Sequence, residues 1–189
     1  MNKIIDIRNK IREYFESNEN CQAFFLADPQ AEKYAGYYTS MYLIQDTAES
    51  LDAHRIKDFS SCPFQAYIEF WGVMQALIIQ QDSISELYEA VTSKSLDINK
   101  LTFWKEIRKL RNVCAGHPAR KDRPKTDPMS RTFLGRNFGG YSLISYEQWI
   151  KGGTQQFVKV ELGKLIDNYA IDAKIALVEI FDFFEKQWP

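Results

Sequence analysis

Apolar side chains recur every three or four residues along most of this 189-residue chain. That spacing gathers them on one face of an α-helix, which completes a turn every 3.6 residues. The two longest stripes run from about Pro29 to Arg55 and over roughly 28 residues from Pro63, each about twice the length of an average helix. The second of them is expected to be kinked or shifted in phase near Gln80, Gln81 and Asp82. The pattern predicts an all-α fold in which long helices pack side by side.

Three further stripes bring the predicted bundle to about five helices. Ile4, Ile7 and Ile11 share a face near the start of the chain, and a fourth helix is expected over about 99–115. The last helix is expected over roughly 155–186. Its second half is apolar on nearly all sides, which indicates burial on several sides or a subunit interface.

Residues at the breaks between stripes predict where the helices end. Asp28 stands directly before a proline and is expected to cap the second helix, while Ser60 or Ser61 is expected to cap the helix that begins at Pro63. Gly116 suits a left-handed cap at the end of the fourth helix, because a proline two residues later prevents the helix from continuing.

The pattern changes between the fourth and the last helix. Residues 118–131 hold three prolines and many charges, which predicts an exposed loop. Residues 132–147 surround a Gly-Gly pair with β-branched and aromatic side chains, which predicts a small β-hairpin, and 151–154 form a turn. We therefore expect one helical domain over 1–189, with a basic loop and β-hairpin inserted at about 118–150.

Composition excludes several classes of protein. The chain has 24 Lys and Arg against 25 Asp and Glu, a net charge of −1, and 45% hydrophobic residues, as in ordinary globular domains. It shows no signal peptide and no 18-residue apolar run, so we expect a cytoplasmic protein with no membrane partner. Two histidines and three cysteines without a CxxC pair do not make a zinc cage, and no cofactor or metal is expected.

The charge is unevenly distributed along the chain. Residues 105–136 hold ten cations against three anions, a net charge of +7, whereas the rest of the chain carries −8. A basic surface on an acidic body favours a polyanionic ligand, although a solvated loop that serves solubility has the same composition. The residues expected to bind phosphates of such a ligand are Arg108, Arg120, Lys121, Arg123 and Lys125.

The most informative segment lies at the end of the predicted fourth helix. Arg111 and Asn112 occupy its last turn, and His117 follows just beyond Gly116. Arginine offers a planar fork that matches phosphate oxygens, and histidine accepts or donates a proton near neutral pH. Asparagine can donate to phosphate or hold the imidazole in one tautomer. These groups suit cleavage of RNA without a metal, with the 2′-hydroxyl as nucleophile.

Structural interpretations of the same residues remain open at this point. His117 can interact with the carbonyls at the helix end, and Arg111 can form a surface ion pair. A Cys114–His117 nucleophile is weakly supported, because Cys114 is expected to face the core. The polar residues that interrupt the third helix either hold the arginine and bind bases or form a polar seam between helices; they are Gln75, Gln80, Gln81 and Asp82.

The segment RNVCAGH, from Arg111 to His117, resembles the motif of the HEPN superfamily (higher eukaryotes and prokaryotes nucleotide-binding). These proteins are all-α bundles with an arginine, usually a polar residue after it, and a histidine a few positions later. The resemblance covers the helical pattern from about residue 30 to 186, and its specific part is 108–118. It implies that Arg111 and His117 form the catalytic pair and that Asn112 assists them.

The resemblance also implies a function and partners. Many HEPN proteins are metal-independent endoribonucleases of toxin–antitoxin, abortive-infection or other defence systems. They commonly form homodimers that bring two motifs into one cleft, and toxin members often pair with a nucleotidyltransferase-type antitoxin. The segment 118–150 lies outside the minimal bundle, as an RNA-binding elaboration or a cover for the cleft.

Two other classes of function fit the sequence. Some HEPN domains keep the bundle without catalysis, so the basic surface can serve a module that only binds RNA, a nucleotide or a protein. The apolar last helix also suits a structural or regulatory helical dimer. The endoribonuclease is the prediction that accounts for Arg111, Asn112 and His117 together.

Overall fold

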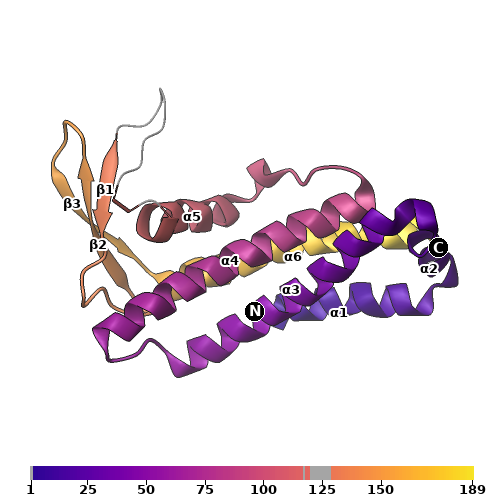
Figure 1. The fold of residues 1–189 in the computed structure, drawn as a ribbon, viewed down its shortest axis with the longest axis horizontal. Coiled ribbons are helices and arrows are strands. Elements are labelled where there is room, and N and C mark those ends of the chain that lie inside the picture. The colour runs from indigo at the N-terminus through magenta and orange to yellow at the C-terminus, as the bar shows by residue number, and fades with distance from the viewer. Residues whose placement is uncertain (1, 117, 120–128) are drawn as a thin grey trace.

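The computed structural model describes residues 2–116, 118–119 and 129–189. Over these residues the chain is mostly helical, with a small antiparallel sheet before the last helix, as the sequence pattern predicts in outline (Figure 1). Its helices and strands are α1 (Asn2–Ser17), α2 (Glu19–Phe25), α3 (Ala31–Lys57), α4 (Pro63–Thr92), α5 (Thr102–Arg111), α6 (Leu162–Gln187), β1 (Ser130–Phe133), β2 (Ile144–Ile150) and β3 (Gln155–Val160).

Four long helices form a closed bundle. Helix α3 packs against α4, α4 against α6, α6 against α1, and α1 against α3. The shorter α5 lies on the outside of this ring, against α4 and α6, and the sheet sits at one end of the bundle (Figure 1). Each long helix therefore buries one apolar stripe between two neighbours, as expected for amphipathic helices.

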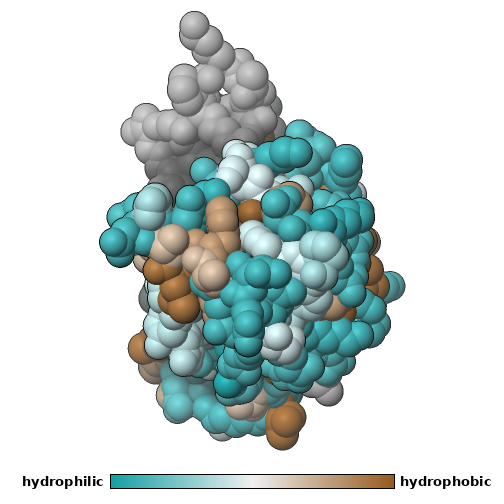
Figure 2. All heavy atoms as spheres, turned by 90° about the vertical axis from the view of Figure 1, so that its right-hand side faces the viewer, coloured by the Kyte–Doolittle hydropathy of each residue, from teal (hydrophilic) through white to brown (hydrophobic). Residues whose placement is uncertain are grey.

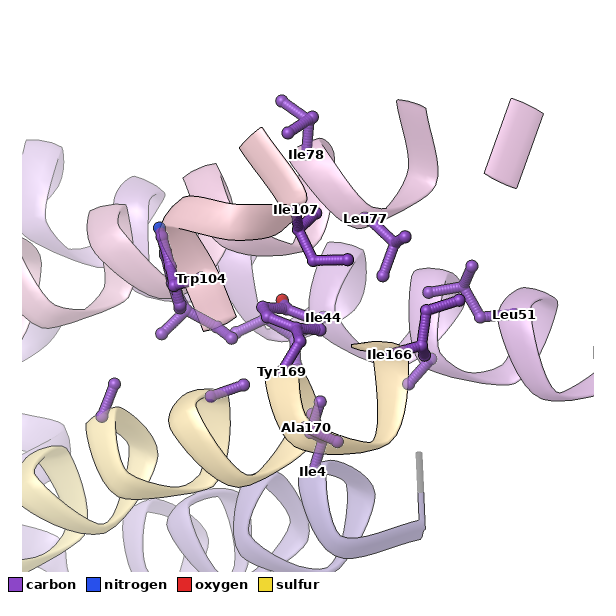
Figure 3. Close-up of a cluster of buried hydrophobic side chains, with 14 of the residues drawn as sticks. Ile4, Ile44, Leu51, Leu77, Ile78, Trp104, Ile107, Ile166, Tyr169 and Ala170 are labelled. Atoms are coloured by element: carbon purple, nitrogen blue, oxygen red, sulfur yellow. The ribbon is translucent and has the colours of Figure 1, made fainter. Parts of the chain in front are cut away.

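The core receives side chains from all six α-helices that the structure describes. Figure 3 shows Ile4 of α1, Ile44 of α3, Leu77 of α4, Trp104 of α5 and Ile166 of α6 converging between the helices. Burying a side chain of this size contributes on the order of 1.5–3 kcal/mol. Because Trp104 is fully buried, α5 belongs to the same core as the four long helices.

Two of the predicted helix caps are wrong. Residues Asp28–Gln30 form a tight 3-10 turn, so α3 begins at Ala31 and Asp28 does not cap it. Helix α4 does start at Pro63, but Cys62 occupies the cap position without a side-chain hydrogen bond to the helix. The Ser60 hydroxyl instead accepts a hydrogen bond of 3.1 Å from the backbone N–H of Cys62, and so shapes the approach to the helix.

The β-structure is larger than the predicted hairpin. The strands form a three-stranded antiparallel sheet in the order β1-β2-β3, with Thr132 opposite Gln148 and Glu147 opposite Phe157. The turn at 151–154 joins β2 to β3, so residues 155–160 are strand rather than the start of the last helix. Pairing with β2 satisfies the backbone groups on one side of this edge strand, and α6 begins only after the sheet.

The predicted turn at the Gly-Gly pair is present between β1 and β2. Gly139 has a φ of 105° and forms an isolated bridge with Ile144. A Cβ at Gly139 would lie 2.0 Å from the carbonyl oxygen of Leu143, so only glycine fits this close approach. The turn directs Phe138 into the core, where its ring lies 5.4 Å from that of Phe70.

The outer faces of the bundle are mixed in character. Helix α6 is not buried on all sides, because Ile171 and Ile175 are exposed while Ala176, Leu177 and Phe184 are in the core. The end of the molecule opposite the sheet is mostly hydrophilic, with apolar side chains in several separate patches (Figure 2). None of the helices in the described ranges combines the length and apolar character that crossing a bilayer requires.

A carboxylate from α6 fixes the start of α5. The cap position of α5, Leu101, offers no side-chain acceptor, so the first N–H groups of the helix need another partner. The buried Asp172 supplies it, accepting hydrogen bonds from the backbone N–H of Phe103 at 2.7 Å and of Trp104 at 3.0 Å. On the other side, Gln81 of α4 donates to the Trp104 carbonyl at 3.1 Å. Helix α5 is thus tied to both helices that it packs against.

This double anchor makes Asp172 a stability determinant. We expect Asp172→Ala to lower the free energy of unfolding by about 2 kcal/mol, because two buried N–H groups lose their acceptor. Asp172→Asn keeps one acceptor oxygen and should cost less. Urea unfolding followed by tryptophan fluorescence measures both values. Asp182, exposed on the same helix, is the control, and Asp182→Ala should change stability by less than about 0.5 kcal/mol. Equal losses for Asp172 and Asp182 would contradict the anchor.

Candidate functional site

Arg111 is the last residue of α5, and the packing of α5 determines its position. Trp104, Ile107 and Leu110 are buried against α4 and α6, as the apolar spacing predicts. Arg108 and Arg111 lie on the partly exposed side of the same helix. The buried face therefore sets the direction in which the two arginines leave the helix.

The chain continues from Arg111 into a π-helical turn, Asn112–Gly116. Val113 and Cys114 are buried and fix this turn to the core, while Asn112 and Gly116 remain partly accessible. Gly116 is not the left-handed cap that the sequence predicts, since the wider turn absorbs the end of the helix without a positive φ at that residue. Single π turns occur frequently at functional sites.

Two neutral side-chain oxygens hold the Arg111 guanidinium. Its Nη1 donates to Oδ1 of Asn112 at 3.2 Å, and its Nη2 donates to Oε1 of Gln75, on α4, at 3.4 Å. Within the described residues, no carboxylate lies within ion-pairing distance of Arg111. The guanidinium is oriented, but its charge is left for another anion.

Arg108 is in a different electrostatic situation. Its Nη2 forms an ion pair with Oδ1 of Asp82, two turns along α4 from Gln75. The prediction that Arg108 binds phosphate therefore meets competition from a carboxylate already in place. Of the two arginines on α5, Arg111 is the one available to a ligand.

The guanidinium of Arg111 lies over the backbone of Gly116. A Cβ placed on Gly116 would lie 2.8 Å from Arg111 Nη1, so the arginine lies directly against this glycine. The structure thus brings together Arg111, Asn112, Gln75 and the backbone of Gly116. His117, which follows, lies outside the described residues, and so do the predicted phosphate ligands Arg120, Lys121, Arg123 and Lys125.

The sheet meets this corner of the molecule. The backbone N–H of Thr132, on β1, donates to the carbonyl of Pro118 at 2.8 Å. Its neighbour Arg131 is exposed on the same strand. A further described cation, Arg136, lies 5.2 Å from the ring centroid of Phe64, at the start of α4. The described cations of the basic window are therefore carried by α5, β1 and the loop after it, around one end of the bundle.

The polar residues of α4 divide between two tasks. Gln80 and Gln81 form the buried seam, where Gln80 donates to Thr47 Oγ1 at 3.1 Å and accepts from the Tyr169 hydroxyl at 3.0 Å. Gln75 and Asp82 are exposed and hold the arginines of α5. Their separation of seven residues, two helical turns, is the sequence signal that places them on one face.

A hollow of about 320 Å³ lies beside α5, between the sheet and the start of α6. Its charged lining is balanced, with Lys109 and Lys164 against Glu106 and Glu161. Because both signs are present in equal number, this hollow offers no net attraction for phosphate. The guanidinium of Arg111, which has no carboxylate partner among the residues that the structure describes, is the stronger candidate for an anion.

No family model, curated protein or solved structure matches this chain. The assignment of a function therefore depends on the residues and geometry described above.

Cys114 is not a nucleophile in this site. Its side chain is buried, and desolvation raises the pKa of the thiol to about 12. At pH 8 only about one part in ten thousand would be thiolate, which is the reactive form. The alternative of a Cys114–His117 pair is therefore disfavoured.

Thiol titration tests this placement. Cys62 is exposed, whereas Cys21 and Cys114 are buried and burial raises both of their pKa values to about 12. We expect a disulfide reagent at pH 8 to modify one thiol rapidly in the native protein and all three in denaturant. The Cys62→Ser variant should lose the rapid phase. A rapid phase that survives in this variant would show that Cys114 or Cys21 is accessible.

Proposed function

We propose that this protein is a metal-independent endoribonuclease of the HEPN type, acting in the cytoplasm as a toxin or defence protein. The observation that carries the proposal is the Arg111 guanidinium, held by two amide oxygens with no described carboxylate at its charge. A fixed cation that is not paired with a protein carboxylate can stabilise the negative charge that develops on a phosphodiester in its transition state. The motif that the sequence shares with HEPN proteins begins at this residue.

The proposed reaction assigns a separate task to each group. The imidazole of His117 removes the proton from a ribose 2′-hydroxyl, and that oxygen attacks the adjacent phosphorus. The bond from phosphorus to the 5′-oxygen breaks, and a second imidazole protonates the leaving oxygen. Arg111 stabilises the added negative charge on the phosphoryl oxygens, and Asn112 orients the guanidinium. The products are a 2′,3′-cyclic phosphate and a 5′-hydroxyl.

The need for a second imidazole supports a homodimer. The chain has two histidines, and the other one, His54, is bonded through Nδ1 to the Tyr141 hydroxyl at 2.7 Å. An acid and a base at one scissile bond are then most simply supplied by His117 of two copies. Two-fold symmetry brings the same residue of each copy to a shared cleft.

An exposed apolar stripe on α4 supports the same assembly. Phe64, Ile68 and Trp71 are 65%, 68% and 46% exposed, and their spacing of four and three residues places them on one face. The next position on that face is Gln75, the residue that holds Arg111. A contiguous apolar stripe of this kind marks an interaction surface, and a second copy seated on it would lie beside Arg111.

Partners other than a second copy follow from the resemblance alone. HEPN toxins are often controlled by a nucleotidyltransferase-type antitoxin, and such a protein is the proposed partner in the cell. The substrate is RNA, for which the basic window supplies the long-range attraction.

Cleavage of a labelled single-stranded RNA in EDTA tests the catalytic proposal. We expect wild-type protein to give products with 2′,3′-cyclic phosphate ends, and His117→Ala to abolish cleavage. Arg111→Lys keeps the charge but loses the fork, so its rate should fall about 10²–10³-fold. Arg55→Ala is the control, because Asp167 already occupies that guanidinium. Salt-sensitive RNA binding without any cleavage would assign the surface to a non-catalytic module instead.

The substitution Gln75→Glu tests the electrostatic argument with almost no change in shape. A carboxylate at this position would pair with Arg111 and compete with phosphate, so we expect RNA cleavage to slow about tenfold or more, with unchanged folding. The control is Gln155→Glu, which adds the same charge on β3, outside the contacts of Arg111. Equal rates for both variants would contradict the view that the unpaired charge of Arg111 matters.

The α4 stripe is tested by the mass of the particle in solution. Ile68→Asp introduces a charge at an exposed position, so it should leave the fold intact, convert dimers to monomers and reduce cleavage in parallel. Ile56→Asp, at a position that is 88% exposed on α3, is the control. Sedimentation equilibrium measures the mass. Persistence of the dimer in Ile68→Asp would place the interface elsewhere.

A further inference from the structure

A buried arginine lies between α1 and α3, and the hydrogen-bond acceptors that the structure shows for it are neutral. Arg8 is only 3% exposed. Its Nε donates to the Met41 carbonyl at 2.9 Å and its Nη1 donates to Oδ1 of Asn9 at 3.0 Å. Both acceptors are neutral, and among the described residues neither a hydrogen bond to Nη2 nor an ion pair with a carboxylate is found. An arginine remains charged in a protein interior, and within the described part of the chain no carboxylate is hydrogen-bonded to this one.

The nearest charged neighbours do not neutralise Arg8. Arg12, one turn along α1, adds a second cation, and Glu16 is bound to Arg12 at 2.6 Å. Burial and the positive charge of Arg12 both disfavour the charged form of Arg8 and lower its pKa. Arg8, Arg12 and Glu16 all line one hollow, so its wall carries two guanidinium groups against one carboxylate, a net positive charge.

That hollow measures about 150 Å³ and its walls are aromatic. Arg8 lines it together with four tyrosines of α3, Tyr34, Tyr37, Tyr38 and Tyr42. Tyr37 is buried and stacks on Phe15 of α1 at 4.6 Å between ring centroids, whereas Tyr38 and Tyr42 are half-exposed. The lining therefore combines one buried tyrosine ring with two half-exposed ones.

The dimensions restrict what the hollow can hold. A volume of 150 Å³ equals about five water molecules, so it takes one ring rather than a nucleotide. Faces of tyrosine rings favour a planar apolar group, and a single unpaired amino group on Arg8 favours a compact anion. A carboxylate suits a single donor group better than a phosphate dianion, because the dianion has more oxygens and more charge that need donors.

We propose that the hollow between α1 and α3 is a binding site for a single-ring aromatic carboxylate, with the carboxylate on Arg8 and the ring among the tyrosines of α3. The site is separate from the candidate nuclease centre, because the residues that line it include none of those that contact Arg111. The helices that form it, α1 and α3, run side by side in the bundle and are contiguous in space (Figure 1). Binding there does not depend on ribonuclease activity.

Calorimetric titration with benzoate tests the site. We expect a Kd on the order of 1 mM or tighter for benzoate, and at least about tenfold weaker binding for acetate, which lacks the ring, and for benzyl alcohol, which lacks the charge. Acetate and benzoate binding with equal affinity would overturn the aromatic part of the site. Absence of benzoate binding would overturn the proposal as a whole.

Two variants separate binding from folding. Arg8→Lys keeps the charge but removes the guanidinium fork, and we expect at least a tenfold loss of benzoate affinity. Tyr38→Ala removes a half-exposed ring from the lining, so it should fold normally and bind benzoate several-fold more weakly. The control, Phe157→Ala, removes an exposed ring from β3 and should bind as the wild type does. Unchanged affinity in Tyr38→Ala and Arg8→Lys would show that Arg8 only links the two helices.

Discussion

The hydrogen bonds that Asp172 accepts from the first turn of α5 help to determine where the candidate site lies. Helix α5 is short and lies outside the four-helix ring, in contact with α4 and α6. The carboxylate of Asp172 fixes its first turn, and the buried Trp104 and Leu110 fix its rotation. Because the first turn and the rotation of α5 are both fixed, the position of its last residue, Arg111, is fixed as well.

The pairing of each cation decides which surface can receive an anion. The sequence alone does not distinguish the arginines of the +7 window by their partners. In the structure Arg108 is bound to Asp82, Arg136 lies over Phe64, and Arg111 is held by amide oxygens. An ion pair at the surface contributes little to stability but occupies the charge, whereas an amide orients a guanidinium and leaves its charge available. The partners of each arginine therefore indicate which one can bind an anion better than the net charge of the window does.

The helices could be predicted from the sequence because their apolar stripes are long and regular. The spacing of Trp104, Ile107 and Leu110 gave the buried face of α5 correctly, and the proline at position 63 gave the start of α4. Errors arose where backbone pairing overrides local preference. Residues 155–160 pair with β2 and are strand, although their pattern alone does not exclude a helix.

The candidate site could be predicted only in part. The proximity of Arg111 and Asn112 follows from their adjacency, and the polar positions of α4 were recognised as either seam or arginine holders. Which of them does which depends on the rotation of α4 relative to α5, a tertiary property that a single sequence does not contain. The π turn before His117 is another such property, because it depends on the burial of Val113 and Cys114 rather than on a signal at Gly116.

The same electrostatic condition occurs twice in this molecule. Arg111 and Arg8 each donate to neutral oxygens and have no described carboxylate as a partner. Their surroundings differ, since Arg111 lies at the edge of a basic, accessible corner and Arg8 in the lining of a small aromatic hollow. An extended polyanion can reach the first and not the second, whereas a compact ring with one charge fits the second and gains little at the first. The exposure around each guanidinium, rather than the guanidinium itself, therefore separates the two classes of ligand.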